Sequence, residues 1–145
     1  AGFDVSLVAR GTHLKAMKHS GLTVIENDKE ISCFPKCSES MSDLGKMDYI
    51  FITLKTYSIP GLVNEISTMF KENTAVITAY NGIPWWYVQN FAGPYTNRPV
   101  LSVDPHRKLF DGIDPDCLIG CIAYPATTIA EPGVVRHIEG NRFPV

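Results

Sequence analysis

Residues 4–11 read Asp4-Val5-Ser6-Leu7-Val8-Ala9-Arg10-Gly11, an apolar-rich run that ends abruptly at an arginine and a glycine. Residues 5–9 are nearly all apolar, which is typical of a parallel strand buried on both faces. Residues 13–20 follow as a predicted helix, which Thr12 can cap and Gly21 ends. A strand, a polar turn and a helix in this order predict one unit of an α/β fold.

The rest of the chain continues this alternation before it becomes rich in strands. A β-hairpin, a buried strand, a helix and a second buried strand are predicted at residues 22–34, 48–54, 57–70 and 74–80. A short aromatic helix and three strands are then predicted at residues 83–87, 100–103, 117–124 and 134–138. The predicted fold class is therefore α/β, with a parallel sheet and a β-rich C-terminal part.

Composition excludes several classes of function. The chain has 145 residues, 45% hydrophobic and 19% charged, which suits one ordinary globular domain. A net charge of −2 without a Lys/Arg run argues against a nucleic-acid partner. No apolar run approaches the roughly 20 residues that span a membrane. The first residues do not have the pattern of a signal peptide, so we expect a cytoplasmic protein.

Cysteines and histidines do not form a convincing metal site in the sequence. The four cysteines form two C-x3-C pairs, for which a zinc site, a disulfide and simple packing of apolar thiols are the alternatives: Cys33, Cys37, Cys117 and Cys121. Packing is favoured, and no metal is predicted. The histidines show neither metal spacing nor an evident partner: His13, His19, His106 and His137.

Three polar loops follow the ends of predicted strands, at Arg10–Gly11, Lys55–Tyr57 and Asn81–Pro84. Ligands of open α/β sheets bind outside the carboxyl ends of the strands, so these loops are candidates for one site. An arginine after the second strand of a dinucleotide-binding fold accommodates the 2′-phosphate of NADP. Each loop alone also has a plain alternative. Arg10 can be a solvated charge, Lys55 can lay its stem on apolar surface, and Asn81-Gly82 can be an ordinary turn.

Two adjacent tryptophans leave a choice open. Trp85 and Trp86 can simply bury apolar area, or they can shape the mouth of a substrate site beside the crevice. They are also the candidates for the interface of a homodimer.

Taken together, five segments resemble the N-terminal NADP-binding domain of the ketopantoate reductases (2-dehydropantoate 2-reductases), which has a Rossmann-like fold. The segments occur in the family's order and cover nearly all of the chain: residues 4–14, 21–22, 53–57, 80–86 and 132–137. The resemblance implies reduction of the ketone of 2-dehydropantoate to (R)-pantoate by NADPH, a step in pantothenate biosynthesis, with a small 2-keto acid as the substrate.

The resemblance also implies roles for matching residues. Arg10 would bind the 2′-phosphate of NADPH, and Lys55 would contact the cofactor near the catalytic cleft. Asn81 would bridge the nicotinamide-ribose side and the substrate, so it is both a cofactor-binding and a substrate-binding candidate. The backbone of Ala126 would meet the nicotinamide end. No catalytic residue is assigned to this chain.

Residues 1–145 would then be part of a larger NADP-binding domain. The family's Gly-rich loop should lie roughly 15–20 residues before Arg10, and its helical substrate domain should follow Val145. Without the first strand, the strands near 5–9 and 48–54 would each have an unpaired edge, so we expect an isolated chain to be marginally stable and prone to aggregation. The alternatives are a non-catalytic nucleotide-binding module, a truncated product without activity, and a dehydrogenase of another 2-keto or 3-hydroxy acid.

Overall fold

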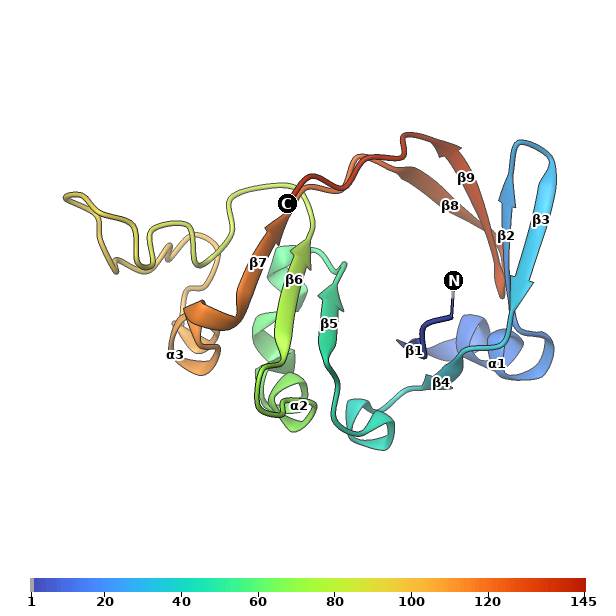
Figure 1. Ribbon diagram of the computed structural model, residues 1–145, viewed down its shortest axis with the longest axis horizontal. Helices are drawn as coiled ribbons and strands as arrows, with labels where there is room; N and C mark the ends of the chain where they lie inside the picture. The colour runs from blue at the N-terminus through green and yellow to red at the C-terminus, as the bar shows by residue number, and fades with distance from the viewer. Residues whose placement is uncertain (1) are drawn as a thin grey trace. The chain divides into compact units, whose positions relative to one another are not determined.

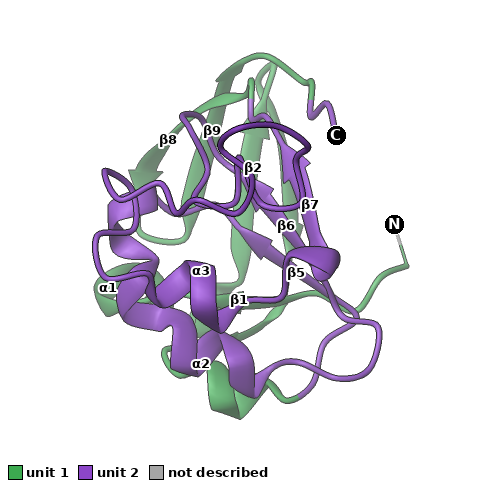
Figure 2. Cartoon of the chain, turned by 90° about the vertical axis from the view of Figure 1, so that its left-hand side faces the viewer, with its two compact units in different colours: residues 1–45, 124–142 green, residues 46–123, 143–145 purple. Residues whose placement is uncertain are grey.

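The computed structural model describes residues 2–145, which divide into two compact units (Figure 1). The first unit runs to Gly45 and includes Tyr124–Arg142, and the second consists of Lys46–Ala123 and Phe143–Val145 (Figure 2). Both are built around parallel strand pairs, so the predicted α/β class with a Rossmann-like parallel arrangement is confirmed.

The opening stretch forms a strand and a helix, as predicted. Strand β1 (Ser6–Val8) pairs in parallel with β4 (Lys36–Ser38), and α1 (Gly11–Ser20) contacts β4. The buried residues of α1 are Leu14 and Met17, which lie one turn apart on one face. The N-cap of α1 is Arg10, and its side chain makes no capping hydrogen bond. The prediction that Thr12 caps the helix is therefore wrong.

A separate four-stranded sheet, ordered β3-β2-β9-β8, completes the first unit. Strands β2 (Leu22–Glu26) and β3 (Lys29–Cys33) form the predicted hairpin, whose turn residues Asn27 and Asp28 have φ of 48° and 59°. Asn and Asp tolerate this left-handed backbone better than other non-glycine residues. Strand β9 (Val134–Glu139) runs parallel to β2 and antiparallel to β8 (Ala126–Glu131).

The second unit is built on a three-stranded parallel sheet, ordered β5-β6-β7. Its strands are β5 (Tyr49–Ile52), β6 (Ala75–Ala79) and β7 (Leu118–Cys121), and its short helices are α2 (Val63–Thr68) and α3 (Lys108–Gly112). Short 3-10 turns complete the two units, at Met41–Leu44, Thr56–Ser58, Pro60–Leu62 and Pro115–Cys117.

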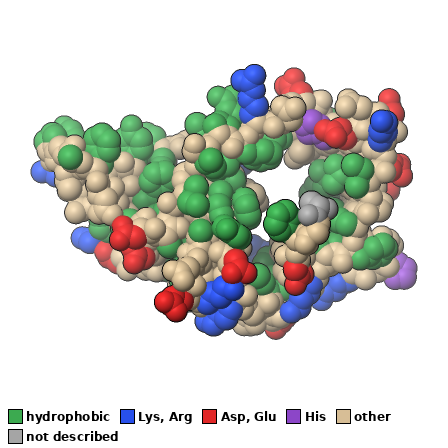
Figure 3. All heavy atoms as spheres, viewed as in Figure 1, with side chains coloured by type: hydrophobic (Ala, Val, Ile, Leu, Met, Phe, Trp, Pro, Cys, Tyr) green, Lys and Arg blue, Asp and Glu red, His purple; other side chains and the backbone are tan. Residues whose placement is uncertain are grey.

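Side chains alternate along β5, so that one face of this strand is covered and the other is open, whereas β6 is buried on both faces. Ile50 and Ile52 are buried, whereas Tyr49 and Phe51 are both 66% exposed. Hydrophobic side chains gather over the three-stranded sheet in Figure 3. Among residues 2–145, β5 pairs only with β6 and β1 pairs only with β4, as expected for strands with one unpaired edge.

Three local predictions are wrong because turns interrupt the elements. The predicted helix at 57–70 is broken into two 3-10 turns before α2, since Pro60 has no N–H for a helical hydrogen bond. Residues 83–87 and 100–103 form turns instead of a helix and a strand; the N–H of Val103 bonds back to the carbonyl of Val100, 2.9 Å away. None of the helices in residues 2–145 is long and apolar enough to cross a membrane.

The alternation along β5 gives a matched test of the fold. Ile52→Ala should lower the free energy of unfolding by about 2–5 kcal/mol, because it leaves a cavity under a 4% exposed side chain. Phe51→Ala, on the open face of the same strand, should change it by only about 0.5 kcal/mol. Chemical denaturation followed by circular dichroism measures both, and equal losses would contradict this assignment of the two faces.

Candidate functional site

Arg10 lies where β1 ends and α1 begins, at the carboxyl end of a parallel strand pair. The backbone N–H of Ala9 bonds to the carbonyl of Ser38 at the end of β4, 3.0 Å away, and the carbonyl of Arg10 accepts from the N–H of Leu14 at 3.3 Å. Among residues 2–145 no hydrogen bond or ion pair holds the exposed guanidinium of Arg10. It is available to a ligand.

The first turn of α1 adds further groups that favour an anion. It contains no acidic residue, and no side chain caps its free N–H groups. Gly11 and Thr12 are exposed there. The partial positive charge of a helix N-terminus and a neighbouring guanidinium both attract a phosphate.

His13, in the same turn, fixes this end of the helix. Its Nδ1 accepts a hydrogen bond from the backbone N–H of Gly133, 3.0 Å away, in the turn between β8 and β9. Gly133 has φ of +83°, and a Cβ there would lie 3.1 Å from Cβ of Ala16. The turn therefore lies closely against α1, a role for His13 that the sequence did not indicate.

In the second unit, Lys55 and Asn81 lie at the same edge of the parallel sheet. Ile52 of β5 and Thr78 of β6 are register partners, and Lys55 and Asn81 each follow three residues later. Both are exposed, and no carboxylate pairs with Lys55 among residues 2–145. Gly82, with φ of +107°, turns the chain directly after Asn81. An ammonium and an amide thus occupy neighbouring strand ends, where α/β sheets bind ligands.

The two tryptophans bury apolar area beneath this edge. Trp85 is fully buried, and its ring stacks on Tyr80 with centroids 6.4 Å apart. Burial raises the pKa of the Tyr80 hydroxyl, so this group stays neutral. Trp86 is half-buried against Gly120, where a Cβ would lie 2.7 Å from Cη2 of the indole. Trp85 therefore takes the packing alternative and does not line a substrate mouth.

Ala126 is the first residue of β8 and is only partly exposed. It lies opposite Glu139 of β9, and the register shifts between Ala126 and Thr127. Such an irregularity re-aims the backbone and leaves peptide groups outside the regular ladder. Ala126 and Arg10 belong to the first unit, on different sheets, whereas Lys55 and Asn81 belong to the second.

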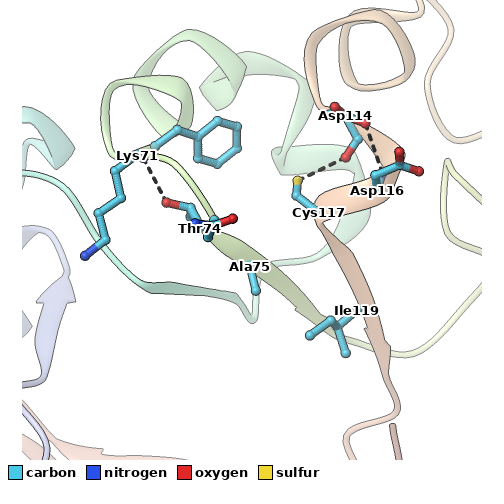
Figure 4. A pocket seen from close by; sticks show the side chains of 9 residues that line it. Lys71, Thr74, Ala75, Asp114, Asp116, Cys117 and Ile119 are labelled. Atoms are coloured by element: carbon cyan, nitrogen blue, oxygen red, sulfur yellow. Dashed lines mark hydrogen bonds between the residues drawn. The ribbon is translucent and has the colours of Figure 1, made fainter.

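A hollow of about 560 Å³ lies at the opposite end of the three-stranded sheet from Lys55 and Asn81. Figure 4 shows its walls, where Thr74 and Ala75 lead into β6, and Cys117 precedes β7. The thiol of Cys117 donates to the carbonyl of Asp114 at 3.0 Å, and burial, with Asp114 nearby, raises the pKa of that thiol. This hollow is not part of the candidate site.

The four cysteines are free. In the first unit, burial also raises the pKa of the Cys37 thiol.

Known proteins with a similar sequence or fold cover nearly the whole chain. The sequence pattern described as "Ketopantoate reductase PanE/ApbA" matches residues 1–142. A 2-dehydropantoate 2-reductase from Mesorhizobium japonicum is 36% identical over 140 residues, which are 97% of this chain and 43% of that protein. The chain thus spans less than half the length of this curated relative.

Solved structures give the same picture. A Ralstonia solanacearum protein assigned as a ketopantoate reductase superposes with a TM-score of 0.89 at 26% identity, over 98% of this chain and 44% of its own. D-mandelate dehydrogenase, solved with NADH and anilino(oxo)acetate, shares the fold at a TM-score of 0.67 and 18% identity, over 95% of this chain and 38% of its own. With a family pattern that matches all but the last three residues, the chain belongs to the ketopantoate reductase PanE/ApbA family.

Proposed function

We propose that this chain binds NADP(H) for an oxidoreductase that reduces 2-dehydropantoate to (R)-pantoate in pantothenate biosynthesis. The observation that carries the proposal is the exposed Arg10 at the acid-free N-terminus of α1, whose guanidinium has no ion-pair partner among residues 2–145. The name of the Mesorhizobium japonicum relative supports the choice of substrate.

The groups around Arg10 suit NADP better than NAD. A guanidinium can hold two oxygens of a 2′-phosphate at once, and the free N–H groups of α1 add to the attraction. NAD recognition ordinarily uses a carboxylate that accepts the free 2′-hydroxyl, and the first turn of α1 has none. The residues present therefore fit the phosphorylated cofactor.

Lys55 and Asn81 would serve the reacting end of the cofactor. An amide both donates and accepts, so Asn81 can bond to a ribose hydroxyl and to the keto acid, while Lys55 supplies positive charge to an anionic group. The backbone of Ala126 would meet the nicotinamide. When bound, NADPH supplies the hydride that reduces the ketone. The role of these residues is to bind and orient the two reactants.

The choice of cofactor tests Arg10 directly. Arg10→Ala should weaken NADPH binding about tenfold to hundredfold, because a charge-assisted hydrogen bond contributes about 1.5–3 kcal/mol. NADH affinity should hardly change. Lys15→Ala, which removes an exposed cation from the same helix, is the control. Calorimetric titration with both nucleotides measures this, and an equal loss for NADPH and NADH would refute the role of Arg10.

Asn81 should matter for the reacting end of the cofactor and for the substrate. Asn81→Ala should lower kcat/KM for 2-dehydropantoate about tenfold or more, because the ribose hydroxyl or keto acid that Asn81 would bind then loses its hydrogen bond and is left unpaired. Asn64→Ala, which removes an exposed amide from α2, should leave kcat/KM unchanged. The assay follows NADPH oxidation by the protein expressed from its complete native reading frame; an unchanged kcat/KM for Asn81→Ala would contradict the assignment.

A panel of 2-keto acids tests the reaction itself. NADPH oxidation by the same full-length preparation should be fastest with 2-dehydropantoate. Faster oxidation with another 2-keto acid would indicate a related dehydrogenase instead. NADPH binding without reduction of any member of the panel would favour a nucleotide-binding module.

A further inference from the structure

Tyr57 presents an exposed ring at the edge of the parallel sheet where Lys55 and Asn81 lie. It is 82% exposed and is the middle residue of the 3-10 turn Thr56–Ser58, which directly follows Lys55. The arrowheads of β5 and β6 point to this edge in Figure 1. Among residues 2–145, no aromatic stack or cation–π contact involves the Tyr57 ring. A planar apolar surface is therefore presented where α/β sheets bind ligands.

The backbone under the Tyr57 ring is fixed. The N–H of Ser58 donates to the carbonyl of Lys55 at 2.9 Å, and the N–H of Ile59 donates to the carbonyl of Thr56 at 3.1 Å. The side chain of Ile59 is fully buried, so it anchors the turn in the second unit. A ring on a fixed turn loses little conformational entropy when a ligand packs on it, and this favours binding.

The other side chains at this edge combine apolar surface with two polar groups. Leu54, past the end of β5, is 39% exposed, and Ile83, past the end of β6, is 59% exposed. Lys55 and Asn81 are exposed at the same edge. A single exposed apolar side chain needs no explanation. Three of them beside a cation and an amide have the composition of a small-molecule site.

A dinucleotide matches these groups better than a keto acid alone does. Planar bases stack on aromatic rings, whereas an aliphatic keto acid has no ring to stack. The two bases of a dinucleotide are joined by anionic phosphates. The ammonium of Lys55, two residues before Tyr57, complements these phosphates, and no carboxylate among residues 2–145 pairs with it. An aromatic ring and a cation side by side thus fit a base and the phosphates attached to it.

We propose that Tyr57 is a cofactor-binding residue, a platform on which one planar base of the dinucleotide stacks while Lys55 attracts the phosphates. The inference rests on the proposed function and adds to it a source of affinity that NADPH and NADH share. Arg10 would bind the 2′-phosphate, which only NADPH carries, whereas both nucleotides carry the same two bases. The effects of Tyr57 and Arg10 on cofactor binding are therefore separable.

Three substitutions at Tyr57 separate stacking from its alternatives, with calorimetric titration of the protein expressed from its complete native reading frame. Tyr57→Ala should raise the dissociation constants of NADPH and NADH by the same factor, about fivefold to hundredfold, because a base stack is lost. Tyr57→Phe should keep both within about twofold, because stacking does not need the hydroxyl. Tyr57→Leu keeps apolar bulk without a planar ring, so it should lose most of the affinity that Tyr57→Ala loses.

Tyr49→Ala is the matched control, because Tyr49 is 66% exposed at the opposite end of the same strand, β5. It should leave both dissociation constants unchanged. Unchanged affinity in Tyr57→Ala, or full affinity in Tyr57→Leu, would overturn the platform. A loss in Tyr57→Ala for NADPH alone would also overturn it, because a stack does not distinguish the two nucleotides. A wild-type protein that binds neither nucleotide would instead refute the proposed function, and this inference with it.

The two halves of the cofactor show which base Tyr57 holds. The inhibition constants of 5′-AMP and reduced nicotinamide mononucleotide are measured by displacement of NADPH from the wild-type protein and from Tyr57→Ala. A loss confined to 5′-AMP assigns the platform to adenine, and a loss confined to the mononucleotide assigns it to the nicotinamide. Either result supports the inference, because one ring takes one base. An equal loss for both halves, or for neither, would overturn it.

Discussion

Parallel pairing of strands in register is the constraint on which the candidate site depends. Because β5 and β6 run in the same direction with Ile52 beside Thr78, the residues three positions later, Lys55 and Asn81, must leave the sheet at the same edge. The parallel pair of β1 and β4 brings Arg10 to a carboxyl end in the same way. Polar side chains at one edge of a sheet can therefore come from distant parts of the sequence without any direct contact between them.

The sequence predicted the elements in which local pattern and tertiary environment agree. The apolar runs at 48–54 and 74–80 became β5 and β6, and Asn27-Asp28 gave the hairpin because these residues accept a left-handed backbone. The predicted helix at 57–70 is wrong. Its apolar spacing is typical of a helix, but Pro60 has no N–H to donate, and the chain forms 3-10 turns there instead. Strands β4 and β8 were not predicted; each is held mainly by its pairing partner, which a local pattern does not reveal.

The candidate site residues could likewise be predicted only where a local sequence pattern marks them. Arg10, Lys55 and Asn81 could be proposed because each directly follows a strand that the sequence makes visible. The partner of His13 is a backbone group, the N–H of Gly133, and backbone groups leave no mark on the residue pattern. His13 and Gly133 are 120 residues apart, so their contact could be found only from the fold. Motif order indicated the family, and the structure supplied a physical task for His13 within its motifs.

We propose that the end of β1 and the first turn of α1 bind the phosphorylated ribose of NADP. The most direct test is to map the backbone amides that shift when 2′-phosphoadenosine 5′-phosphate is added to the isotopically labelled protein, expressed from its complete native reading frame, with 5′-AMP as the comparison. We expect shifts specific to the 2′-phosphate at Arg10, Gly11 and Thr12. Shifts confined to the hollow lined by Lys71, Thr74 and Asp114, or identical shifts with both nucleotides, would contradict it.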